Sequence, residues 1–136
     1  MAEKLVDAGA DIIIGHGSHL IQEIEKYKDK WLIYSLGNFV FNSPGRYQKK
    51  DSWPYSAISI LRFSFENNKL NARIRLYPIV TDNLLTNYQT HPVDEKDFNK
   101  TIELLMDKSV SSKALLSNLR KGRDKLGFYL EGIVLQ

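Results

Sequence analysis

A short helical pattern followed at once by an unbroken apolar run constrains the fold of this chain more than any other feature. Residues 1–8 have the apolar spacing of a helix, and Gly9 follows as a typical helix terminator. The run from Ala10 to Gly15 has the composition of a strand that is buried on both faces of a sheet. Helix, buried strand and polar loop in this order predict the α/β class, in which functional groups gather at the carboxyl ends of strands.

Two histidines follow this predicted strand. His16 and His19 lie in a glycine-containing segment, and glycine allows a loop to bend sharply around a bound ion. Two imidazoles on one loop can converge on a metal, although the same spacing also fits ordinary polar loop residues. Metal sites usually need three or more protein ligands, and the rest of the chain offers few. His91 is isolated in sequence, and we expect it in a surface loop.

Two polar residues are candidates for supporting the histidine loop. Ser18 lies within the loop itself. Asn38 follows Gly37 at the expected end of another strand, where its side-chain carbonyl could bond the loop or a ligand. A role in stabilising its own turn fits Asn38 equally well. No residue is assigned a catalytic role.

Further along the chain, alternating apolar residues predict strands, and apolar residues three and four apart predict helices. The expected strands cover residues 20–27, 31–36, 39–41, 55–65, 70–79 and 129–135. We expect the first two of these to form one hairpin, and those at 55–65 and 70–79 to form another around a polar turn. One expected helix starts at Asp94, where an acidic first turn favours the helix dipole, and its apolar stripe is Phe98, Ile102, Leu105 and Met106. A second helix is expected over residues 112–120, after which Gly122 and Gly127 interrupt the pattern. Residues 42–54 predict a long loop, and the aromatics Tyr47, Trp53 and Tyr55 at 44–54 and just beyond suit either a lid or core packing.

Composition limits the classes of protein. A chain of 136 residues with 43% apolar residues builds one domain or part of a larger one. The absence of cysteine excludes disulfides and thiolate zinc sites. A net charge of +3 is too small to indicate a nucleic-acid partner. The basic stretch 108–125 predicts a solvated helical face, with an anion-binding patch as the alternative. No apolar run approaches the roughly 20 residues of a membrane span.

Two longer motifs carry a resemblance to a known family. Residues 8–25, with the core Ile14-Gly15-His16-Gly17-Ser18-His19, resemble the last core motif of the CapA family of capsule and poly-γ-glutamate biosynthesis proteins, which are related to calcineurin-like metallophosphoesterases. Residues 31–41 resemble the next segment of the same family. Residues 76–79 with Asp82-Asn83 are similar to the strand and loop that follow the family core.

The resemblance implies a fold and a site. The fold is the C-terminal portion of a metallophosphoesterase-like α/β sandwich, a mixed sheet with hairpins flanked by helices. Residues 1–80 would form the C-terminal half of the core, and residues 81–136 a helical C-terminal extension with a terminal strand in the same domain. His16 and His19 match the family's final histidine motif and would be metal ligands, whereas Asn38 matches a position without an assigned metal role.

The family's earlier motifs, which supply aspartates, an asparagine–histidine pair and a further histidine, would precede residue 1. We therefore expect the chain to be the C-terminal part of a CapA-type domain. It would bind a divalent metal (Mn, Zn or Fe) only in the complete protein. The activity implied is that of a metal-dependent hydrolase or transferase, with the chain inactive by itself.

Other interpretations stay open. The chain could be a catalytically inactive remnant, or an accessory or scaffold module of cell-surface polymer synthesis, or an anchoring part of the capsule machinery. The expected partners are an anionic cell-surface polymer or its precursor, and the N-terminal part of the domain. We also expect homo-oligomers through exposed sheet edges. By resemblance, the place of action is the bacterial cell envelope.

Overall fold

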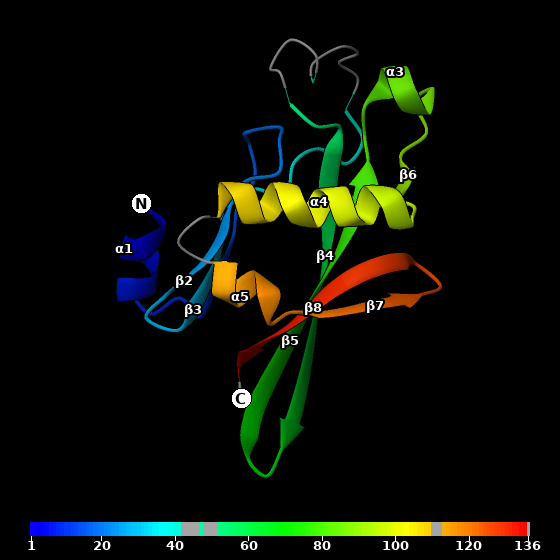
Figure 1. The fold of residues 1–136 in the computed structure, drawn as a ribbon. Coiled ribbons are helices and arrows are strands. Elements are labelled where there is room, and N and C mark those ends of the chain that lie inside the picture. Colours follow the sequence, from blue (N-terminus) through cyan, green and yellow to red (C-terminus); the bar gives the residue numbers. More distant parts are fainter. Residues whose placement is uncertain (42–46, 48–51, 110–112, 136) are drawn as a thin grey trace.

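The computed structural model describes residues 1–41, 47, 52–109 and 113–135, which form two β-sheets flanked by helices (Figure 1). This arrangement confirms the predicted α/β class. The helices are α1 (Ala2–Asp7), α3 (Asn83–Thr86), α4 (Glu95–Lys108) and α5 (Lys113–Ser117). The strands are β1 (Ile12–Ile14), β2 (Ile24–Tyr27), β3 (Lys30–Ile33), β4 (Tyr55–Glu66), β5 (Lys69–Val80), β6 (His91–Pro92), β7 (Arg120–Asp124) and β8 (Gly127–Leu135).

The smaller sheet has the strand order β1-β3-β2 and is mixed, because β1 runs parallel to β3 and β2 antiparallel to it. The β2–β3 hairpin confirms the predicted one, with shorter strands. Its turn is formed by Lys28 and Asp29, both at positive φ. Expected full burial of the first strand is wrong: Ile12–Ile14 is half-buried, because β1 pairs within the described chain only with β3.

The larger sheet has the strand order β4-β5-β8-β7, with β6 paired to β5. The predicted hairpin of residues 55–79 is confirmed as β4–β5, which keeps one register from Tyr55 opposite Val80 to Glu66 opposite Lys69. The predicted terminal strand is confirmed as β8, which pairs with β5 on one side and β7 on the other.

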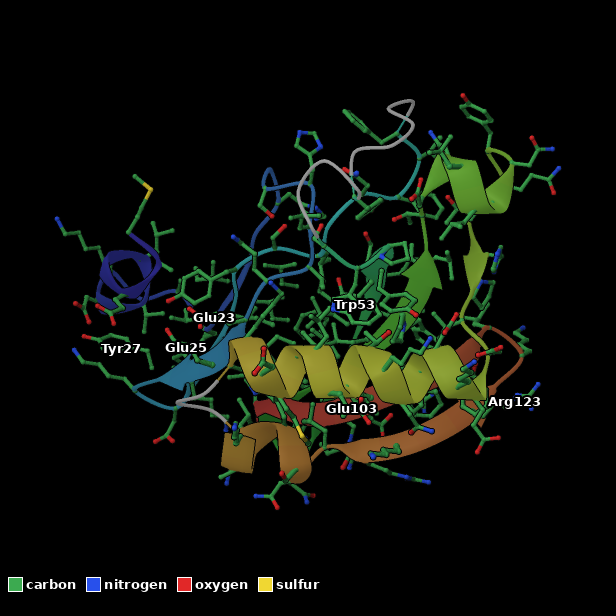
Figure 2. The ribbon with its side chains drawn as sticks, turned by 45° about the horizontal axis from the view of Figure 1, so that its top comes forward. Glu23, Glu25, Tyr27, Trp53, Glu103 and Arg123 are labelled. Atoms are coloured by element: carbon green, nitrogen blue, oxygen red, sulfur yellow. The ribbon has the colours of Figure 1, made fainter. Side chains whose placement is uncertain are left out.

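Helix α4 covers one face of the larger sheet (Figure 1). Asp94 is its N-cap and accepts a hydrogen bond from the Asp97 N–H at 2.8 Å, as the acidic first turn predicted. Phe98, Ile102 and Leu105 of the predicted apolar stripe are buried in the core. That core also contains buried residues of both sheets, among them Ile24, Trp31, Ile33, Ile74 and Leu76. Trp53 lies near Glu103 on the side of α4 (Figure 2).

Hydrogen bonds join segments that lie far apart in sequence. The Trp31 Nε1–H of β3 donates to the Ile133 carbonyl of β8 at 2.8 Å. The Ile24 N–H of β2 donates to Ser109 Oγ, just after α4, at 3.0 Å. The Ala57 N–H of β4 donates to the Leu36 carbonyl at 2.8 Å. The first two hydrogen bonds join residues of the segment 1–80 to residues of the segment 81–136.

The second predicted helix is too long, and the strand after it was not predicted. Helix α5 ends at Ser117, and β7 begins at Arg120. The basic stretch 108–125 is therefore only partly helical, because Arg120, Lys121 and Arg123 lie on a strand. Gly122 signalled an interruption in the sequence, but it belongs to β7: a Cβ there would lie 2.4 Å from the ring of Tyr129 on β8. Only a residue without a side chain allows that aromatic ring to cover the strand.

The expected strand at 39–41 is also wrong, since these residues form no strand. The carbonyls of Phe39 and Phe41 instead accept hydrogen bonds from side chains further along the chain. Most of the expected loop 42–54 lies outside the described residues. Among the helices described, none has the length and apolar character needed to cross a membrane.

Candidate functional site

The histidine loop starts where β1 ends. Gly15 continues the pairing of β1, because its N–H donates to the Ile33 carbonyl at 2.7 Å and its carbonyl accepts from the Leu36 N–H at 3.2 Å. A Cβ at Gly15 would lie 2.2 Å from the Tyr34 carbonyl oxygen, so only glycine fits there. This close approach fixes the point at which the loop with His16 leaves the sheet.

The loop itself turns through two residues at positive φ. Gly17 has φ +108°, and His19 has φ +65°, which is uncommon for a residue with a side chain. Ser18 Oγ donates to the Leu20 carbonyl at 2.7 Å and accepts from the Leu20 N–H at 3.3 Å. Ser18 therefore stabilises the loop locally. His16 is exposed, whereas His19 is half-buried.

The structure brings His19 and Asn38 together. His19 Nδ1 lies 2.9 Å from Asn38 Oδ1, and the imidazole ring lies 4.5 Å from the ring of Phe41 between centroids. An amide oxygen only accepts hydrogen bonds, so Nδ1 is the donor in this contact, and in the neutral imidazole the lone pair is then on Nε2. A second polar group that fixes the tautomer in this way is typical of metal-ligating histidines.

The turn that contains Asn38 packs against a group of buried hydroxyl groups. Gly37 has φ +81°, and a Cβ there would lie 2.4 Å from Ser56 Oγ. Ser56 Oγ lies 3.1 Å from Thr81 Oγ1, and the Tyr47 hydroxyl bonds both of these groups. Ser56 of β4, bonded to Thr81 just after β5, thus holds the Gly37–Asn38 turn beside the histidine loop.

Two further residues near the site could not be predicted from the sequence. Asn83 Nδ2 donates to the Phe41 carbonyl at 2.6 Å, and Thr90 Oγ1 donates to the Phe39 carbonyl at 2.8 Å. They hold in place the segment that contacts His19. The Asp82-Asn83 pair was noticed only for its family likeness, and nothing in the sequence indicated its contact with residue 41.

Other candidate residues lie elsewhere. His91 is exposed, and its Nδ1 lies 2.9 Å from the Pro92 carbonyl; it belongs to the short strand β6. Of the aromatics considered for a lid, Tyr47 and Tyr55 are buried, whereas Trp53 is 50% exposed and stacks on Tyr55.

The histidine loop carries two imidazole groups that are available as donors. His19 offers Nε2, and His16 offers an exposed imidazole on the same loop. Within the described residues, no group of three or more His, Cys, Asp or Glu side chains is placed to hold a metal ion. Two imidazoles alone hold a divalent ion weakly, so this part of the chain supplies at most part of a site.

A family match covers the histidine loop and the strands around it. Residues 1–43 match the family described as "Bacterial capsule synthesis protein PGA_cap". This match covers β1, the histidine loop, the β2–β3 hairpin and Asn38. It confirms the resemblance to CapA-type proteins over the N-terminal third of the chain.

Individual relatives agree with the family match. The chain is 52% identical over 52 residues to the capsule biosynthesis protein CapA of Bacillus anthracis, an alignment that covers 38% of this chain and 12% of the relative. It is 52% identical over 42 residues to the PGA biosynthesis protein CapA of Bacillus subtilis, covering 31% and 11% respectively. An uncharacterized protein of Sinorhizobium fredii, y4sH, matches with the same identity over 42 residues, or 31% of this chain and 9% of its own. The chain thus spans about a tenth of the length of these relatives.

Proposed function

We propose that this chain acts in capsule or poly-γ-glutamate biosynthesis and supplies His16 and His19 to a divalent metal site of the metallophosphoesterase kind. The contact between His19 Nδ1 and Asn38 Oδ1 carries the proposal. Both residues lie in the segment that matches the capsule synthesis family. Metal-ligating histidines usually have their second ring nitrogen held by a partner of this kind.

The residues of the chain have separate roles in the proposed site. His19 would bind the ion through Nε2, and His16 through its exposed ring. Asn38 orients the His19 ring, and Phe41 packs against that ring. Such a metal, when bound, polarises a phosphoryl or similar group. The remaining ligands, including carboxylates, would come from polypeptide that corresponds to other parts of the relatives. The metal would be manganese, zinc or iron.

An accessory role in polymer synthesis is the second candidate. The basic side chains of Arg120, Lys121 and Arg123 are exposed on β7, where they can contact an acidic polymer without any metal. The lack of a complete ligand set within the described residues agrees with this role. The two functions differ in what the histidines do, so replacing the histidines distinguishes them.

A hybrid protein tests the metal site. Residues 1–43 would replace the matching segment of the Bacillus subtilis relative, and the metal content of the purified hybrid would be measured by mass spectrometry. We expect metal that is retained through dialysis. It should be lost when His16 or His19 is replaced by alanine.

Asn38→Ala should weaken the affinity of the hybrid about tenfold, because the orienting partner of His19 is lost. Lys26→Ala in the same hybrid is the matched control, since Lys26 is exposed on β2 outside the histidine loop and its replacement should leave the metal content unchanged. Metal content that is unchanged after both His16 and His19 are replaced would contradict the metal proposal and favour the accessory role.

A further inference from the structure

The outer half of β4 is an exposed sheet edge. Within the described chain, β4 pairs only with β5 in the larger sheet. Near its start the other side of β4 is covered, because the Ala57 N–H donates to the Leu36 carbonyl. Residues 62–66 are exposed, and the tip of the β4–β5 hairpin projects beyond the helices (Figure 1).

The register shows which backbone groups face this edge. Asn67 and Asn68, both in the left-handed region, form the two-residue turn between Glu66 and Lys69. In such a hairpin the residues flanking the turn exchange hydrogen bonds, and the pattern then alternates along the strand. Even-numbered residues of β4 therefore bond β5, and odd-numbered residues direct N–H and C=O groups outward. The outward N–H of Ala57 agrees with this pattern.

The side chains along this edge are complementary to those of a second, antiparallel copy of the same segment. The sequence Arg62-Phe63-Ser64-Phe65-Glu66 has opposite charges at its two ends and a phenylalanine on each side of the central serine. If a second β4 lies antiparallel with Ser64 opposite Ser64, then Phe63 lies opposite Phe65 and Arg62 opposite Glu66, each twice. Facing aromatic pairs and facing opposite charges both stabilise antiparallel strands.

The backbone pattern allows the same register. The outward groups belong to the odd-numbered residues, so Phe63 of one copy and Phe65 of the other can exchange both of their hydrogen bonds. Ser64 then forms the pair whose own backbone bonds lie within each hairpin. A shift by one residue would place each outward-directed residue opposite an inward-directed one, so the hydrogen bonds could not form, and both the charge and the aromatic pairs would be lost.

This pairing would reduce two unfavourable features of the single chain, the exposure of two phenylalanines and a pair of facing arginines. Phe63 is 61% exposed and Phe65 69% exposed, although they continue the core-facing side of the hairpin. Arg62 lies directly opposite Arg73 of β5, an unfavourable arrangement of like charges. A carboxylate from Glu66 of a second copy on the other side of Arg62 offsets that repulsion.

We propose that two copies of this chain associate through their β4 edges, antiparallel about a two-fold axis at Ser64, so that their larger sheets become continuous. The edge has no proline, lysine or bulge along β4 to oppose such pairing. Because one strand per copy makes the contact, the dimer is weak and depends on concentration. The proposal is independent of the metal site.

Charge reversal tests the register. The apparent mass of the intact 15.7 kDa chain would be followed by light scattering and sedimentation equilibrium over a concentration series. We expect reversible dimers, and we expect Arg62→Glu or Glu66→Arg to weaken them roughly tenfold or more, because two attractive pairs become repulsive. The double variant R62E/E66R should restore association, since it recreates both pairs in reverse.

Lys121→Glu is the matched control. It makes the same change in net charge on β7, at the opposite edge of the sheet, and should leave the dimer unchanged. A wild-type chain that stays monomeric up to about millimolar concentration, where specific weak dimers form, would overturn the proposal. So would a double variant no better than the single ones, or an equal loss in the control. Circular dichroism of each variant verifies that the fold is kept.

A cysteine placed on the proposed axis gives a direct second measurement. The chain has no cysteine, so Ser64→Cys introduces a single thiol. Directly opposite residues of this pair type have Cα atoms about 4.5 Å apart, within the range of roughly 4.4–6.8 Å that a disulfide needs. We expect rapid covalent dimers after mild oxidation. Asn71→Cys, opposite Ser64 on β5 but away from the edge, should form them slowly. Equal rates would refute this register.

Discussion

Replacing Trp31 by phenylalanine tests whether the two sheets form one cooperative unit. Trp31 belongs to β3 of the smaller sheet and is 1% exposed. Its Nε1–H donates to the Ile133 carbonyl of β8 at 2.8 Å. Its ring also lies against Gly132, where a Cβ would approach Cζ2 to 2.6 Å. One side chain thus supplies both a hydrogen bond and close packing between the sheets.

The cost has two parts. Loss of the indole N–H leaves the partly buried Ile133 carbonyl without this donor, which costs about 1–2 kcal/mol. The smaller phenylalanine ring leaves a cavity beside Gly132, which costs about 1–2 kcal/mol more. The expected loss in the free energy of unfolding is therefore about 2–4 kcal/mol. For a domain of this size that corresponds to a decrease in Tm of roughly 6–14 °C.

Thermal and denaturant unfolding followed by circular dichroism would measure this loss. Trp53→Phe is the matched control, because Trp53 is 50% exposed and its replacement should change stability by less than about 0.5 kcal/mol. Both variants should unfold in a single transition. A Trp31→Phe chain as stable as the control would refute the assigned role, and so would separate transitions for the two sheets.

Two further predictions concern the turn at Gly37, beside the histidine loop, and Tyr34, which directly follows β3. Gly37→Ala should destabilise the chain by about 2–4 kcal/mol in denaturant unfolding, because φ is +81° and the new Cβ would meet Ser56. Gly17→Ala, also at positive φ but with open space around it, should cost only about 1–2 kcal/mol, and equal costs would contradict the close approach. The Tyr34 hydroxyl donates to Glu25 at 2.5 Å, and this bond together with burial raises the pKa of Tyr34 to about 12 from the ordinary 10.0. Because the folded pKa is raised, this stabilisation is complete below pH 10 and is lost as the pH rises through 12. The difference in unfolding free energy between wild type and Tyr34→Phe should therefore shrink over that range, and a constant difference would exclude the bond.

Local patterns in the sequence predicted the elements that depend on near neighbours along the chain. Asp94 and the stripe through Phe98 predicted α4, because helix caps and apolar spacing act within a few residues. The β4–β5 hairpin followed from alternation around a polar turn. Strand β7 was not predicted, because Gly122 is favourable there only once the ring of Tyr129 covers it.

The candidate site likewise has a part that the sequence predicted and a part that depends on tertiary packing. Placing His16 and His19 after a strand required only the order of residues, and the family likeness followed from the same segment. The hydrogen bond between His19 and Asn38 joins residues 19 positions apart, and its geometry depends on how Ser56 of β4 supports Gly37. Sequence spacing contains no information on that support.

The sequence by itself determined the α/β order of elements, the histidine pair at a strand end and the self-complementary segment 62–66. Only the tertiary structure decided which nitrogen of His19 is directed by Asn38, how Trp31 reaches Ile133 102 positions away, and which edge of β4 is exposed. The physical reason is that apolar periodicity acts along the chain, whereas hydrogen bonds between distant segments depend on strand register and on the packing that brings those segments together.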